Sequence, residues 1–302
     1  MPSNALDREP EFVVGDPVPN DRPSVGRGTR PRKSIRSPIG LLLIFGVVAG
    51  AASLYFFRSN VNAPPPAPVA MTTEAPLVAP QTPEIRYPVE RIAGASEATQ
   101  PQLTLPPLDD SDAQARDSIA AIQNGDTWIS LLVPGGIVRH LVATVDALPQ
   151  KTLAVQARPV ISAPGPFQTT ISSGGMAIAA DNASRYAPYV SAAEAIDSTR
   201  LAGFYVRFYP MLQQAYVELG YPKGYFNDRV IATIDHLIAA PEPHAPVYLT
   251  QPRVVYEFAD PILENLSAGQ KIMVRMGLDN ERRIKAKLRD VRAKLAVEPL
   301  AR

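Results

Sequence analysis

The sequence predicts a mainly α-helical domain with a few short β-strands (α+β), joined by a linker to a single-pass transmembrane helix. Three observations predict this organisation. One long uncharged apolar stretch lies near the N-terminus, a proline-rich segment follows it, and apolar patterns of helical period fill most of the remaining chain. We therefore expect a tail over 1–38, a spanning helix over 39–57, a linker over 58–107, one globular domain over 108–297 and a short end segment over 298–302.

The composition argues against several functional classes. The 302 residues include 30 Lys+Arg and 29 Asp+Glu, for a net charge of +1, whereas nucleic-acid binders usually carry a clear cationic excess. The chain has no cysteine, so disulfides, thiolate metal sites and a cysteine nucleophile are excluded. None of its 3 histidines has a partner at metal-ligand spacing. We expect no nucleic-acid partner, no metal and no cofactor.

The apolar stretch over 39–57 reads IGLLLIFGVVAGAASLYFF and contains no charge. At a rise of about 1.5 Å per residue it spans about 28 Å, close to the ~30 Å hydrocarbon core of a bilayer. Basic residues precede the stretch, and only Arg58 follows it closely. The positive-inside rule places the basic tail over 1–38, which we expect to be disordered, in the cytoplasm. The preceding basic residues are Arg27, Arg30, Arg32, Lys33 and Arg36.

A cleaved signal peptide is the alternative to a membrane anchor. Its apolar core usually has about 7–15 residues, which is shorter than this stretch. The small-residue sequence Val61-Asn62-Ala63 resembles a cleavage site, but Pro64 follows it directly and disfavours cleavage. We therefore predict an uncleaved anchor. Gly46 and Gly50 form a GxxxG pattern that lets two spanning helices approach closely, although glycine is common in such helices anyway. A homodimer is thus a candidate assembly.

The linker over 58–107 has proline every few residues and no lasting apolar period. Such a segment favours the extended polyproline II conformation. At about 3.1 Å per residue, nearly fifty residues reach up to about 150 Å. We interpret it as a tether that carries the domain away from the bilayer.

Helix signals begin at Leu108. Ser111 and Gln114 have the spacing of a capping box, and a second apolar face runs over 136–147. The longest helix is predicted over 198–219, with Pro210 inside it and an aromatic stripe that we interpret as core rather than as a ligand groove.

The C-terminal third predicts three further helices. Asn227 is expected to cap the first of them. Asp260-Pro261 begins a second helix that runs to Gly277, and Asp279 opens the last one.

Three segments are predicted to be extended. Residues 155–161 read as a strand, and 167–178 read as a hairpin around the turn Ser172 to Gly175. Residues 247–258 read as an edge strand or irregular segment, because Pro252 interrupts them.

No motif for nucleophilic catalysis or phosphate binding is present. Carboxylates such as Glu257, Asp260 and Glu264 offer an acid pair in principle, but Asp260 already has a capping role. The C-terminal segment is basic, and four of its side chains are candidate contacts for an anionic lipid or glycan. The alternative is a solvated helix face with partners four residues apart. The four candidates are Arg282, Arg283, Lys285 and Lys287.

Several blocks of the sequence resemble bacterial membrane-anchored proteins grouped as domain of unknown function 3014. They are LPPLDDSDAQARD, LLVPGGIVRHLVATVDALP, SRYAPYV, AYVELGYP and FADPILENLSAGQKIMVRMG, and they cover about 105–295 in order. The resemblance implies an envelope protein of Gram-negative bacteria. Together with the charge difference across the apolar stretch, we expect an inner-membrane anchor with the domain in the periplasm. The resemblance implies no activity, and no functional residues carry over.

We expect a non-enzymatic periplasmic interaction module that binds another envelope protein or a cell-wall polymer. One alternative is an envelope hydrolase or transferase whose site forms only in the fold. The other is the binding of an anionic lipid or glycan through the basic C-terminal helix.

Overall fold

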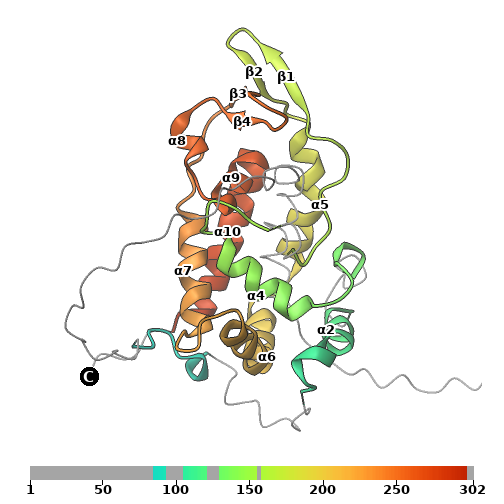
Figure 1. Cartoon of the computed structure of the whole chain (residues 1–302), viewed down its shortest axis with the longest axis vertical. Helices are drawn as coiled ribbons and strands as arrows, with labels where there is room; N and C mark the ends of the chain where they lie inside the picture. The colour runs from blue at the N-terminus through green and yellow to red at the C-terminus, as the bar shows by residue number, and fades with distance from the viewer. Residues whose placement is uncertain (1–83, 93–104, 121–128, 155–157, 298–302) are drawn as a thin grey trace, which may run out of the picture. The chain divides into compact units, whose positions relative to one another are not determined.

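The computed structural model describes residues 84–92, 105–120, 129–154 and 158–297, which Figure 1 draws in colour. The expected tail and spanning helix, with Gly46 and Gly50, lie outside these residues. Within the described ranges, no helix is both long enough and apolar enough to cross a bilayer. The described chain is mainly helical with two short antiparallel sheets, as the sequence predicts.

Helix α10 (Leu278–Leu295) is the element around which the domain is built. It contacts α5 (Asn182–Ala195), α6 (Ser198–Glu218), α7 (Phe226–Ile238) and α9 (Ala268–Arg275). Four apolar side chains with helical spacing are fully buried along it, and each contributes about 1.5–3 kcal/mol. They are Ile284, Leu288, Val291 and Leu295.

The aromatic stripe of α6 lies in this core, which confirms the core interpretation. Phe204 and Phe208 stack with ring centroids 4.3 Å apart, and the Tyr205 side chain is wholly inaccessible. Pro210 sits inside the helix. Asp197 caps the first turn by accepting a hydrogen bond from the Arg200 backbone N–H at 2.8 Å.

The predicted capping box at Ser111 does not form, and the residue after it caps α4 (Ile137–Ala147) instead. A 3₁₀ turn, η2 (Leu108–Asp110), precedes α2 (Ser111–Ala120), and the Ser111 hydroxyl donates back to Leu108 rather than capping its own helix. Asp112 of α2 instead accepts from the backbone N–H groups of Gly136 and Ile137 at 2.7 and 2.8 Å. The cap therefore joins two helices, and no local spacing rule predicts it.

Residues 84–92 belong to the folded domain, so the predicted tether is wrong over this stretch. The Asp228 carboxylate accepts from the backbone N–H groups of Arg86 and Tyr87 at 3.0 and 2.9 Å. The short helix η1 (Val89–Arg91) buries the Val89 side chain against the core, and the Val89 backbone N–H donates to the Tyr225 hydroxyl. Proline content in this segment obscured a docking site made by distant residues.

Asn227 does not cap α7. The residue at the cap position is Tyr225, and Asn227 is buried within the first turn. Its amide nitrogen donates to the Tyr87 carbonyl at 2.8 Å and lies 3.4 Å from the Leu295 carbonyl. Asn227 thus joins the docked segment to the end of α10.

Four strands and one short helix form a separate small unit, which we call the β module (167–178 and 247–266). Hairpin strands β1 (Thr169–Ser172) and β2 (Gly175–Ile178) confirm the predicted hairpin. The segment over 247–258 forms only the two-residue strands β3 (Leu249–Thr250) and β4 (Glu257–Phe258). A bridge between Ala177 and Tyr248 places the hairpin beside them (Figure 1).

Two other expectations need correction. In the described part of 155–161, the structure has a single bridge from Val160 to Leu132 instead of a strand. The helix begun by Asp260-Pro261 ends after one turn, as α8 (Pro261–Glu264), and Ser267 caps a new helix, α9. The Ser267 hydroxyl accepts from the Gln270 N–H at 3.2 Å. An apolar pattern continues across this break, so periodicity alone does not reveal it.

The β module has its own small core. Leu249, Phe258, Leu263 and Val274 are buried together there, separate from the main core. Val274 comes from α9, whose neighbours Ile272 and Met273 point into the main core. Helix α9 is therefore shared between the two cores.

Replacement of two helical glycines by alanine should change the stability of the domain in opposite directions. A Cβ on Gly269 of α9 would lie 2.9 Å from the Leu148 carbonyl oxygen and 2.6 Å from Leu237, whereas one on Gly203 of α6 meets no heavy atom within 4 Å. We expect Gly269→Ala to lower the free energy of unfolding by about 2 kcal/mol through overpacking. Gly203→Ala should raise it by about 0.5–1 kcal/mol through helix propensity. Denaturant titration of the full-length chain, followed by circular dichroism, measures both. Equal effects of the two variants would contradict this packing of α9.

Candidate functional site

The basic residues of α10 are mostly used inside the domain. Lys285 is buried, and its Nζ donates to the Ala240 carbonyl at 2.6 Å and to Glu242 at 2.9 Å. Ala240 lies just beyond the C-terminal end of α7. Because helix C-termini carry unsatisfied carbonyls and partial negative charge, a buried lysine is well placed there.

Lys287 does the same for α5. The Lys287 side chain is buried. Its Nζ donates to the carbonyl of Ile196, the C-cap residue of α5, and also to the Ser198 hydroxyl at 2.8 Å. The two lysines thus fix the ends of the two helices on either side of α10. They are not available as surface contacts for an anionic polymer.

The two arginines of the predicted site are exposed to different degrees and each has an acidic partner. The Arg282 Nε donates to Glu242 at 2.9 Å, and Arg283 makes a forked pair with Glu194, in which its Nε donates at 2.9 Å. These pairs point to different neighbours, so the structure does not gather the four predicted residues into one cationic surface. An anionic ligand would have to displace Glu242 and Glu194.

The carboxylates considered as an acid pair have separate structural roles. Asp260 caps α8 by accepting from the Ile262 N–H at 2.8 Å. Glu264 accepts from the Phe258 N–H at 2.8 Å and pairs with Lys271. These contacts link the β module to α9.

The histidines are also dispersed. His236 is half-buried and shares a hydrogen bond of 2.8 Å with the Ser267 hydroxyl, and burial lowers its pKa. His140 packs against Gly136, whereas His244 is exposed in the loop beyond α7. Among the described residues, no three His, Asp or Glu side chains are grouped so that they could hold a metal ion.

Glu281 is the most unusual ionisable group on α10. Its side chain is 1% exposed, and Lys285 lies 3.0 Å from Oε1 in an ion pair with poor hydrogen-bond geometry. Burial raises the pKa of Glu281 to about 7, and Lys285 offsets only part of this effect. Glu242, on the exposed side of Lys285, has its pKa lowered to about 2 by hydrogen bonds from Arg282 and Lys285. Near neutral pH, the buried lysine therefore draws its counter-charge mainly from Glu242.

Exposed apolar side chains are concentrated on the β module. Ile171 of β1 is 80% exposed, Ile262 of α8 is 74% exposed and Val254 of the β3–β4 loop is 62% exposed. No other large apolar side chain in the described ranges is as exposed as these three. Singly exposed apolar residues are common, but these three all belong to one small unit, which makes that unit a candidate region for contact with a partner.

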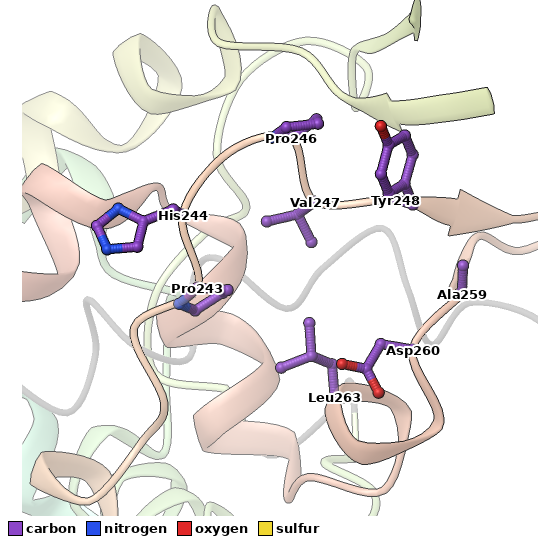
Figure 2. A pocket seen from close by; sticks show the side chains of 8 residues that line it. All are labelled: Pro243, His244, Pro246, Val247, Tyr248, Ala259, Asp260 and Leu263. Carbon is purple, nitrogen blue, oxygen red and sulfur yellow. The ribbon is translucent and has the colours of Figure 1, made fainter. Parts of the chain in front are cut away.

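A surface hollow of about 400 Å³ opens beside this module. Figure 2 shows Pro243, Val247 and Leu263 directed towards its interior, with His244 and Asp260 on opposite sides. The peptide bond between Ala245 and Pro246 in its rim is cis. The Asp260 carboxylate in its wall is engaged as a helix cap, and most of the other lining side chains are apolar.

The turn of the hairpin is fitted to its neighbour. A Cβ on Gly174 would lie 2.3 Å from the Tyr248 hydroxyl, so only glycine allows the tyrosine ring to lie over the turn. Tyr248 also lines the hollow. Tyr248 thus belongs both to the wall of the hollow and to the contact with the hairpin turn. Neither the hairpin signal nor the loop composition predicts this contact.

Comparison with known proteins supplies one match. The family described as "Protein of unknown function (DUF3014)" matches residues 137–292. The chain belongs to this family. The matched region of this DUF3014 protein begins with α4 and ends within α10, so it includes the β module, the hollow and the buried lysines. No curated protein and no solved structure matches the chain.

The raised pKa of Glu281 predicts a pH-dependent stability. An unfolded glutamate titrates near 4.5, whereas Glu281 in the folded domain holds its proton to about 7. Between these values the folded state binds more protons, so this residue makes the domain less stable as the pH rises from about 4.5 to about 7. We expect Glu281→Gln to remove that loss, which amounts to about 2–3 kcal/mol at neutral pH.

The measurement compares unfolding of the two proteins from pH 4.5 to 8. Glu194→Gln is the matched control, because the Glu194 pKa is lowered by Arg283 and its contribution is already fully present above pH 4.5. Parallel pH profiles for the wild type and Glu281→Gln would contradict the neutral buried carboxyl.

Proposed function

We propose that this DUF3014 protein is a non-enzymatic interaction module of the bacterial envelope. It is anchored in the inner membrane by 39–57, with its N-terminus in the cytoplasm and its domain in the periplasm. The β module binds a protein partner through apolar contact. The observation that carries this proposal is the concentration of exposed Ile171, Val254 and Ile262 on a small unit with its own core.

The electrostatics of the domain favour this function over its alternatives. The cationic candidates on α10 are either buried, as are Lys285 and Lys287, or paired with acids. This arrangement gives no support to binding of an anionic lipid or glycan there. The carboxylates near the hollow are occupied by a cap and an ion pair, which gives no support to hydrolysis. The side chains of Ile171, Val254 and Ile262, in contrast, are more than half exposed and are buried in neither core.

The topology rests on the sequence. An uncharged stretch of the right length and the charge difference across it support one spanning helix with the domain exported. Gly46 and Gly50 would let two such helices approach.

Topology predicts a clear protease pattern. In spheroplasts of a Gram-negative host, external protease should degrade the domain and leave the N-terminal tail and span protected. Carbonate washing should leave the full-length protein in the membrane, because a spanning helix is held by apolar burial rather than by charge. A cytoplasmic marker protein controls for lysis. Protection of the domain, or its release by carbonate, would overturn the anchored topology.

Contact through the β module predicts position-dependent crosslinking in cells. A photoreactive residue at Ile262 should yield one discrete protein adduct, whereas the same residue at Val217, 40% exposed on α6, should yield none. Val254→Asp should weaken the Ile262 adduct by about tenfold or more, because a charge is costly to bury in an apolar contact. Adducts with lipid only, or equal adducts from both positions, would count against the proposal.

A further inference from the structure

We propose that the outer edge of β1 pairs with the same edge of a second copy of this chain, as an antiparallel two-fold dimer. The inference rests on the proposed function, because it names the partner of the β module. It concerns the folded domain and is independent of any contact between Gly46 and Gly50 in the membrane.

The hydrogen-bond pattern of the hairpin shows which backbone groups of β1 face outward. Thr169 is paired with Ile178, and the Ile178 N–H points out of the hairpin to the Val247 carbonyl at 3.0 Å. In an antiparallel pair, the backbone N–H and C=O groups of two opposed residues either all point towards the partner strand or all point away from it. The N–H and C=O of Thr169 therefore point away from β2, and so do those of Ile171, two residues further on.

This edge is open. In the described ranges, β1 is hydrogen-bonded to β2 alone, and no hydrogen bond reaches the outward groups of Thr169 and Ile171. Natural edge strands are usually protected by charges, prolines or bulges. This one has none of them: the chain carries no charged residue between Arg158 and Asp181, and Thr170 and Ile171 are exposed.

The side chains of this edge suit a second copy. Placing the two-fold axis at Thr170 sets Thr169 opposite the partner's Ile171, and the reverse, so that both outward-facing residues exchange two backbone bonds. Thr170 then faces the partner's Thr170 across a non-hydrogen-bonded pair. All three residues are β-branched, which favours strands, and threonine pairs well with threonine across an antiparallel pair.

The absence of charge also favours a copy over an unrelated protein. Identical surfaces bring identical charges together, so a charged edge would repel itself. Partner selection among different proteins usually depends on complementary charge, and this edge offers none. An uncharged, self-complementary strand is therefore better suited to a closed two-fold contact than to recognition of a charged foreign segment.

The test uses a single cysteine in the full-length protein, which has no cysteine of its own. In the proposed register, Thr170→Cys lies about 4.5 Å from its counterpart between Cα atoms, within the range for a disulfide. Ser173→Cys, which is exposed in the same hairpin, would be about 20 Å from its counterpart. Mild oxidation of membranes should convert most of the Thr170→Cys protein to a disulfide-linked dimer and leave the Ser173→Cys protein monomeric.

Substitutions of Ile171 distinguish pairing through the backbone from non-specific apolar association. Ile171→Pro, in the Thr170→Cys protein, removes an outward N–H without removing a hydrogen bond to β2, and should reduce the crosslinked dimer by about tenfold. Ile171→Lys should reduce it by like-charge repulsion, whereas Ile171→Val should leave it unchanged. Circular dichroism and thermal unfolding of each variant confirm that the domain still folds.

The outcomes distinguish this inference from the proposed function. A position-specific dimer that Ile171→Pro abolishes supports the paired edge. A Thr170→Cys protein that stays monomeric, or that crosslinks no better than Ser173→Cys, overturns it. If that occurs while the Ile262 crosslinker still captures a different protein, the interaction module stands and the second copy is not its partner. If neither experiment yields a protein adduct, both proposals fail.

Discussion

The burial of α10 is the constraint on which the domain depends. This helix has a basic composition, yet four of its neighbours cover it, so its lysines must find partners inside the protein. Lys285 and Lys287 do so at the C-terminal ends of α7 and α5, where helix carbonyls lack partners. The apolar stripe on α10 holds the neighbouring helices in contact, and the two ammonium groups fix where those helices end. The charged face that suggests a ligand site is therefore part of the scaffold.

The sequence predicts best where the signal and its partner are close in the chain. The cap at Asp260-Pro261, the hairpin around Ser173-Gly174 and the apolar stripe of α10 are each readable within a few residues. Predictions fail where the partner is distant. Asp112 caps another helix, Asn227 contacts the docked segment, and Asp228 holds the backbone of 86–87.

The candidate site shows the same limit. An arginine or lysine is recognisable in sequence, but whether it meets solvent or a helix end depends on tertiary contacts, as Lys285 shows. The exposure of Ile171 and Ile262 is likewise invisible in their periodicity, because apolar residues in alternating or helical patterns are normally assigned to the core. One clue was local: the long run without charge around the hairpin marks an edge that lacks the usual protection.

The docked segment at 84–92 changes the geometry of attachment. With the domain beginning at the contacts of Arg86 and Tyr87 with Asp228, the free part of the predicted tether shortens to 58–83, and its greatest extension falls from about 150 Å to about 80 Å. The domain of an anchored chain would then sample a thinner layer above the bilayer, at a higher local concentration. Any pull along the tether would also load the N-terminal end of α7 first, and would reach α10 through the Asn227 side chain.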